Sequence, residues 1–139
     1  MQPHTIVAYD AELKELDGLI GDMAGGAQSA LEDATKALFA GDVRLAQQVI
    51  AGDASIDLLQ HNIEEKAIST IATRQPVAID LRQIVSAIRI ANDLERIGDH
   101  ATNIAETTHY LITGDMLSAD RPKADESSGV APSWGHTKI

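Results

Sequence analysis

Three long stretches of this sequence repeat apolar side chains at intervals of three and four residues. They cover about residues 5–39, 43–73 and 76–112, and the core-facing stripe of the first stretch ends with Ala34 and Leu38. That interval places the apolar side chains on one face of an α-helix, which can then pack against other helices. Only Ala40-Gly41-Asp42 and Arg74-Gln75 separate the three stretches. Connections this short force consecutive helices to run antiparallel.

The expected fold is therefore an all-α, antiparallel up-down-up bundle of three long helices, each on the order of 45–50 Å in length. Hydrophobic residues make up 44% of the chain and aromatic residues only 3%. An aliphatic core of this kind suits packed helices better than a sheet sandwich. We expect the bundle to occupy residues 1–115. Residues 116–139 contain prolines, serines and charges without periodicity, so we expect a linker or a disordered tail.

Several residues indicate where the helices begin and end. Asp42 is a typical N-cap for the second helix, Pro76 suits the first position of the third, and Gly114 suits a left-handed stop. Glycines inside the first stretch each cost about 1 kcal/mol relative to alanine. We expect the close approach of a neighbouring helix to offset that cost. These glycines are Gly18, Gly21, Gly25 and Gly26.

Charge and composition exclude several classes of function. The formal net charge of −10 argues against nucleic acid as a partner and permits binding of cations or of a basic partner. The absence of cysteine excludes disulfides, thiolate metal sites and a cysteine nucleophile. We find no catalytic constellation, no membrane span and no signal peptide, so we expect a cytoplasmic protein that is not an enzyme.

Two pairs of acidic residues share the spacing acid-x-x-x-acid, one pair on the second helix and one on the third. One helical turn separates the carboxylates of each pair, so both can point the same way. If the two helices bring the pairs together, four carboxylates converge, and such a group favours a hard multivalent cation. The candidate metal ligands are Asp53, Asp57, Glu95, Asp99 and, as extensions of the site, Asn103 and Glu106.

Other interpretations of these polar residues stay open. An exposed network of ion pairs, such as Arg89 with Asp93, needs no metal and contributes little per pair. A ferritin-like di-iron centre requires two Glu-x-x-His motifs in a four-helix bundle, and the sequence offers only Glu106 with His109. His61 is more consistent with a surface histidine than with a ligand.

Three arginines, Arg82, Arg89 and Arg96, recur every seven residues along the third stretch. This spacing places them on one side of the helix. They are candidates for a partner-binding or dimer-facing stripe, for a phosphate-binding surface, or for a solvated stripe that balances neighbouring acids.

With these residues identified, the sequence resembles the PhoU family, accessory regulators of bacterial phosphate transport. The resemblance covers roughly residues 4–115. It rests on four segments: Tyr9-Asp-Ala-Glu-Leu, Asp53-Ala-Ser-Ile-Asp, Arg74-Gln-Pro-Val-Ala-Ile-Asp-Leu-Arg, and Asp93-Leu-Glu-Arg-Ile-Gly-Asp-His-Ala-Thr-Asn-Ile-Ala-Glu.

The resemblance implies properties that spacing alone does not reveal. Family members are all-α proteins built from two three-helix repeats. They form homodimers and bind clusters of iron or other multivalent metals through acid-x-x-x-Asp motifs, matched here by Asp53/Asp57 and Glu95/Asp99. They are thought to link the ATPase subunit of the phosphate ABC transporter to a sensor histidine kinase, and so repress phosphate uptake and the starvation response. The alternative function is a metal-binding bundle for iron storage or sequestration.

The sequence departs from the family pattern in length. A family member would continue from about residue 121 into a second repeat, whereas this sequence stops at Ile139. If the repeats pack on one another, a single repeat leaves apolar surface uncovered, and we therefore expect it to self-associate.

Overall fold

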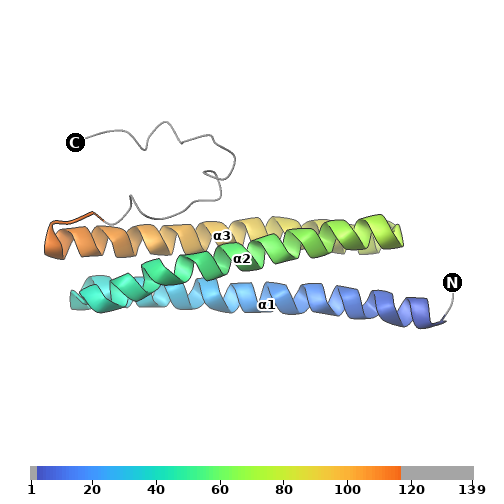
Figure 1. Ribbon diagram of the computed structural model, residues 1–139, viewed down its shortest axis with the longest axis horizontal. Helices are drawn as coiled ribbons and strands as arrows, with labels where there is room; N and C mark the ends of the chain where they lie inside the picture. Colours follow the sequence, from blue (N-terminus) through green and yellow to red (C-terminus); the bar gives the residue numbers. More distant parts are fainter. Residues whose placement is uncertain (1–2, 117–139) are drawn as a thin grey trace, which may run out of the picture.

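The computed structural model describes residues 3–116 and contains three α-helices. They are α1 (Pro3–Ala40), α2 (Val43–Arg74) and α3 (Ala78–Thr113). The helices lie side by side as an up-down-up bundle in which α2 runs against the other two (Figure 1). No strand occurs in the described residues, and the all-α prediction is confirmed. The predicted tail, apart from Met116, lies outside the described residues.

The core is aliphatic, as the composition indicates, and has two parts. One contains the large buried side chains of Leu16, Met23, Ile63 and Ile84. The other is built almost entirely from alanines of all three helices together with Val49, so the backbones approach closely there. None of the three helices has a segment apolar enough to cross a membrane.

One residue of the predicted apolar stripe of α1 lies outside the core. Leu38 is 41% exposed, whereas its neighbour Ala37 is fully buried. The alanine core at this end leaves little space between helices, so the smaller side chain takes the inner position and leucine remains at the surface.

The helix ends follow the sequence signals with one correction. The carboxylate of Asp42 accepts a 3.0 Å hydrogen bond from the amide of Leu45, and Gly114 has the left-handed φ of 79°. Pro76, however, is not the first residue of α3, which begins at Ala78. Gln75 closes α2 in a left-handed conformation, with φ 46° and its amide bonded to the carbonyl of Ile71. Pro76 is therefore used to turn the chain before α3 starts.

The expectation that a neighbouring helix approaches the glycines of α1 is wrong for most of them. A Cβ on Gly18, Gly21 or Gly25 would meet no described atom within 4 Å, and the one exception is Gly26, near Ile56 at 3.7 Å. These glycines face outward, where no part of the described chain covers them. The close approach occurs instead on α3. A Cβ on Gly98 would lie 3.0 Å from Cδ1 of Ile56.

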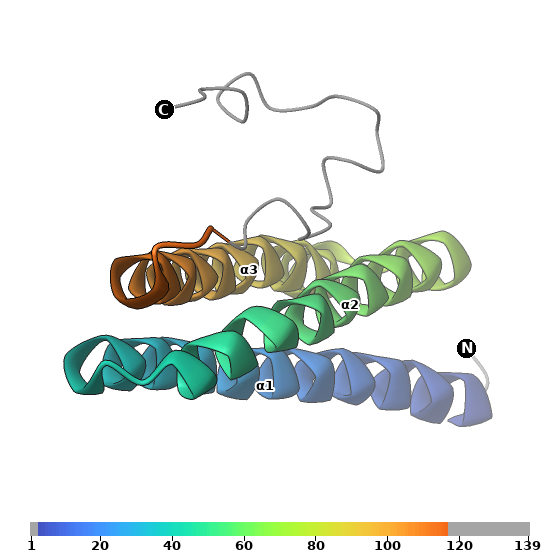
Figure 2. The ribbon, with the colours of Figure 1, turned by 60° about the vertical axis from the view of Figure 1, so that its left-hand side comes forward.

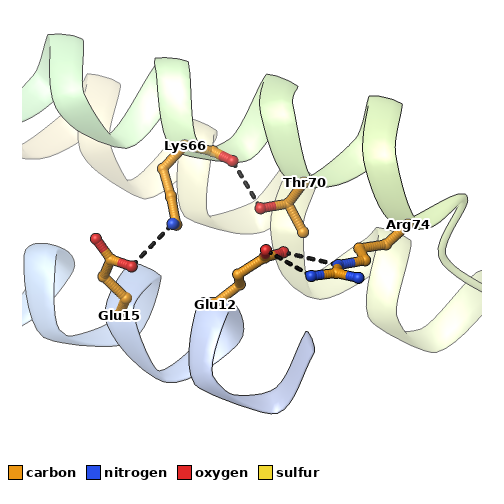
Figure 3. Close-up of polar contacts among 5 residues, drawn as sticks. All are labelled: Glu12, Glu15, Lys66, Thr70 and Arg74. Carbon is orange, nitrogen blue, oxygen red and sulfur yellow. Dashed lines mark hydrogen bonds and ion pairs between the residues drawn. The ribbon is translucent and has the colours of Figure 1, made fainter. Parts of the chain in front are cut away.

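Ion pairs connect α1 to α2 near the end of the bundle that holds the α2–α3 turn (Figure 3). The guanidinium of Arg74 binds both carboxylate oxygens of Glu12, with Nη2 2.9 Å from Oε1 and Nε 3.2 Å from Oε2. Lys66 Nζ lies 2.8 Å from Glu15 Oε2. The hydrogen bonds from Arg74 lower the pKa of Glu12, against the opposing effect of burial. The paired geometry fixes the register of the two helices.

Candidate metal centre

The predicted carboxylates lie along the contact between α2 and α3. Because the two helices are antiparallel, Asp53 is level with Thr102, whose hydroxyl donates a 3.0 Å hydrogen bond to Asp53 Oδ1. Both side chains are buried, at 4% and 1% exposed. Further along the same contact, Gln60 Nε2 donates to Asn92 Oδ1 at 2.7 Å. These two cross-helix bonds bracket the stretch that carries Asp57, and they hold the facing helices in register.

The pKa of Glu95 depends on its burial and on the other three predicted acids. Its pKa is raised from 4.5 to about 8, first by burial, then by a hydrogen bond with Asp99 and by the charge of that residue, and then by the charges of Asp57 and Asp53. Glu95 therefore retains a proton at neutral pH, where an ordinary glutamate is ionised. Asp99, Asp57 and Asp53 thus all lie within electrostatic range of Glu95.

Four carboxylates provide the oxygen donors that hard multivalent cations prefer, and their mutual repulsion is relieved by a bound positive charge. In this conformation, however, no three His, Asp or Glu side chains among the described residues converge tightly enough to hold one ion. Binding would therefore require side-chain rotation, or ions shared between the pairs and completed by water.

Asn103, the fifth predicted ligand, lies one helical turn after Asp99. Its side chain is exposed and lines a different groove, together with Leu38, Ile104 and Leu111. Glu106, by contrast, is buried on α3, four residues beyond Thr102. The carboxylates whose charges act on Glu95 are those of Asp99, Asp57 and Asp53.

Sequence reasoning missed two residues that shape this contact. Thr102 provides the hydrogen bond to Asp53, and Gly98 gives Ile56 room to approach α3. The available signal was their spacing: both are small and lie three or seven residues after Glu95, on the side of α3 that carries the acids.

His109 and His61 have partners other than the four acids. His109 is buried, and its Nδ1 lies 2.9 Å from the carbonyl oxygen of Asp115 and 3.2 Å from Thr113 Oγ1. It thus binds the end of its own helix. His61 is exposed and contacts Glu65 at 3.1 Å, as expected for a surface histidine.

The three arginines spaced by seven residues are all exposed on α3. A solvated stripe agrees with this placement, and the same exposure leaves Arg82, Arg89 and Arg96 accessible to a partner.

Comparison with known proteins places the metal-centre residues inside a recognised domain. A family model described as the PhoU domain matches residues 20–108. The relatives include a phosphate-specific transport system accessory protein PhoU homolog from Caulobacter vibrioides, 44% identical over 119 residues, covering 86% of this chain and 52% of the relative.

Two further proteins of the same name have similar sequence identity and coverage. The Rhizobium meliloti homolog is 48% identical over 103 residues, covering 74% of this chain and 44% of its own length. The Aquifex aeolicus homolog is 48% identical over 100 residues, covering 72% of this chain and 45% of its own length. The chain thus spans about half the length of the curated relatives it matches.

Proposed function

The chain belongs to the PhoU family, and on that basis we propose that it is an accessory regulator of phosphate transport. In this role it represses phosphate uptake and the starvation response when phosphate is plentiful. It acts in the cytoplasm as an adaptor between the ATPase subunit of the phosphate ABC transporter and a sensor histidine kinase. It requires no catalytic chemistry of its own.

The observation that carries this proposal is the 44–48% identity to relatives named as phosphate-specific transport accessory proteins. The matched domain, residues 20–108, contains the four acids of α2 and α3. The chain spans about half of those relatives, so we propose rather than infer from similarity alone that it has the role of the whole relative.

A phosphate-starvation reporter tests the proposal. The host lacks its own PhoU protein and is grown in high phosphate, with and without this chain. Silencing of the reporter is the expected result. A reporter that stays active even when the remaining half of a relative is supplied as a second polypeptide would contradict the proposal.

We also propose that Asp53, Asp57, Glu95 and Asp99 bind a multivalent cation such as iron. The supporting observation is that burial, the hydrogen bond with Asp99 and the charges of the other acids together raise the pKa of Glu95 to about 8. A bound cation would offset their repulsion and would exchange with the proton that Glu95 retains. A role in iron storage is the alternative to regulation and rests on the same four residues.

The test compares metal content after loading with Fe³⁺ and desalting. The double variant Asp57→Asn/Glu95→Gln is expected to lose bound iron. A matched control, Asp22→Asn/Glu32→Gln, makes the same two kinds of substitution at exposed positions on α1 and is expected to retain bound iron. Full iron content in the first variant would refute the assignment. A variant that loses iron but still silences the reporter would separate metal binding from regulation.

A further inference from the structure

The side of α3 that faces away from α1 and α2, its outer side, carries more basic than acidic side chains. Figure 2 shows α3 at one edge of the bundle, beside the other two helices. Arg82, Arg89 and Arg96 are all exposed on α3, whereas Asp93 is the one acid of this helix that is exposed. The chain as a whole has a formal charge of −10, so this side is a local patch of positive charge on an acidic protein.

The other acids of α3 are directed at the neighbouring helices. Burial, and then the charge of Asp80, raise the pKa of Tyr9, which places Asp80 beside α1. Glu95 and Asp99 are hydrogen-bonded to each other within electrostatic range of the acids of α2, and Glu106 is buried. The packing of the bundle thus separates the charges of α3, with acids toward the other helices and arginines outward.

The three arginines have no carboxylate partner within ion-pair distance among residues 3–116. The ion pairs in that part of the chain join Arg74 and Lys66 to glutamates of α1, and His61 to Glu65. A guanidinium group has five N–H donors in a planar arrangement that matches a carboxylate. On the outer side of α3 these donors are therefore available to an acidic group from outside this part of the chain.

The arginines and the apolar residues next to them repeat at the same interval. Arg89 is followed by Ile90, which is 46% exposed, and Arg96 is followed by Ile97, which is 39% exposed. Seven residues of α-helix rise by about 10.5 Å and fall about 20° short of two full turns. The arginines and the isoleucines thus form two nearly straight rows along α3. A second helix lying along α3 would present its own side chains at the same interval.

The two rows together favour a protein partner over other anions. Inorganic phosphate would bind guanidinium groups but would leave Ile90 and Ile97 without an apolar contact. An anionic bilayer would attract the arginines but would repel the rest of a chain with a formal charge of −10. An acidic amphipathic helix satisfies both rows, because it offers apolar side chains to the isoleucines and carboxylates to the arginines.

Charge also favours a separate chain over the remaining half of the longer relatives. Opposite charges speed the encounter of separate proteins and discriminate among partners, whereas a tethered domain is already present at a high effective concentration. The apolar end of the bundle differs in this respect. There Phe39 is 85% exposed beside the groove lined by Leu38 and Leu111, and no Asp, Glu, Lys or Arg lines that groove. The arginine row is the surface with the features that a diffusing partner requires.

We propose that the outer side of α3 docks an acidic amphipathic helix of a separate partner protein. Carboxylates of that helix pair with Arg89 and Arg96, its apolar residues pack on Ile90 and Ile97, and Arg82 extends the row. The proposal rests on the proposed function, because it names the chemistry by which the adaptor recognises one of its partners.

The test uses the full chain and a designed helical peptide of about three heptads. Each heptad of the peptide has one leucine beside one glutamate, with alanine and glutamine elsewhere, and fluorescence anisotropy measures binding. Arg89→Gln/Arg96→Gln is expected to raise the dissociation constant at least about tenfold, because two charge-assisted contacts are lost. The matched control, Lys36→Gln/Arg44→Gln, removes the same charge from exposed positions on α1 and α2 and should bind the peptide as the wild type does.

A second peptide, with glutamine in place of every glutamate, is expected to bind at least about tenfold more weakly. Equal losses of affinity in the two double variants would overturn the proposal. Loss of binding in Phe39→Ser would also overturn it, because the peptide would then occupy the apolar end of the bundle. So would binding to vesicles of anionic phospholipid through the arginines without binding to the acidic peptide, which would assign this side of α3 to a membrane surface.

Two further results separate this surface from the remaining half of the relatives and from the regulatory role. That half, supplied as a second polypeptide, should leave peptide binding intact, and displacement of the peptide would overturn the proposal. A chain that silences the phosphate reporter but binds no acidic peptide would refute this surface and leave the regulatory proposal standing. Binding through the arginines without silencing, even with that half supplied, would support the surface and contradict the regulatory proposal.

Discussion

The hydroxyl of Thr102 on α3 donates a 3.0 Å hydrogen bond to Oδ1 of Asp53 on α2, and both side chains are buried. A buried carboxylate is costly without hydrogen-bond donors, so this bond helps to keep Asp53 in the contact between the two helices. The same hydroxyl lies 3.0 Å from the carbonyl oxygen of Gly98 on its own helix. Thr102 thus positions an acid that lies on the facing helix.

Replacing Thr102 by valine should therefore destabilise the protein. Thr102→Val keeps the shape of the side chain but removes a donor from a buried acid, so we expect the free energy of unfolding to fall by about 1–2 kcal/mol. Urea denaturation measures the change. Thr107→Val, at an exposed position on the same helix, should change little. Equal effects of the two substitutions would show that the bond to Asp53 contributes nothing to stability.

Substitution of glycine should change stability in opposite directions at an open position and at the packed position Gly98. Gly21→Ala meets no described atom and should raise the free energy of unfolding by about 0.5–1 kcal/mol, because alanine favours the helix. Gly98→Val should lower it by about 2–3 kcal/mol, because the added methyl groups collide with Ile56. Thermal unfolding of both variants tests the contrast. A stabilising Gly98→Val would show that α2 and α3 are packed less closely than described.

Glu95 should make stability decrease with rising pH. Its pKa in the folded chain, about 8, is above the ordinary value of 4.5, so the folded state retains a proton that the unfolded state loses between these values. The stabilisation is complete below about pH 4.5 and is lost as pH rises through about 8. Glu95→Gln should remove this slope.

The measurement compares wild type and Glu95→Gln by urea denaturation at pH 5 and pH 8.5, with a chelator present. The side chain is partly exposed, so solvent screening makes the effect on stability smaller than the full pKa shift implies. We expect the free energy of unfolding of Glu95→Gln to exceed that of the wild type by about 1–2 kcal/mol at pH 8.5. At pH 5 the two proteins should differ little. A constant difference across this range would mean that Glu95 does not titrate as described.

The pairing of Glu12 with Arg74 should make the stability of the protein decrease as the pH falls into the acid range. The hydrogen bonds from Arg74 lower its pKa, so its contribution is present above the ordinary glutamate pKa and is lost as pH falls through the lowered value. Glu12→Gln should reduce the loss of stability below about pH 4.5. Acid titration followed by circular dichroism provides the test. Identical acid transitions for the variant and the wild type would contradict a role for this pair in acid stability.

Much of the fold was predictable because its determinants are local. Apolar spacing identified three helices, Asp42 marked the start of α2, and Gly114 marked the end of α3. Pro76 was assigned wrongly because proline suits both a helix start and a turn, and the left-handed Gln75 decided between them. Leu38 was assigned to the core because spacing cannot distinguish it from Ala37 when the interhelical distance is unknown.

The candidate site was predictable in its parts. The acid-x-x-x-acid pairs are visible in the sequence, since i and i+4 residues share a helix face. That Asn103 lines a groove with Leu38 was not visible, because it depends on the rotation of α3 against its neighbours.

By itself, the sequence determined three antiparallel helices, an aliphatic core and two pairs of acids, because helix periodicity, capping and short turns act over a few residues. Three features depended on the tertiary structure alone. Burial and neighbouring acids raise the pKa of Glu95, Ile56 packs against Gly98, and Phe39 is exposed beside a groove. Each of these depends on how closely whole helices approach and how they rotate about their axes. That outcome is set by the simultaneous packing of side chains from all three helices.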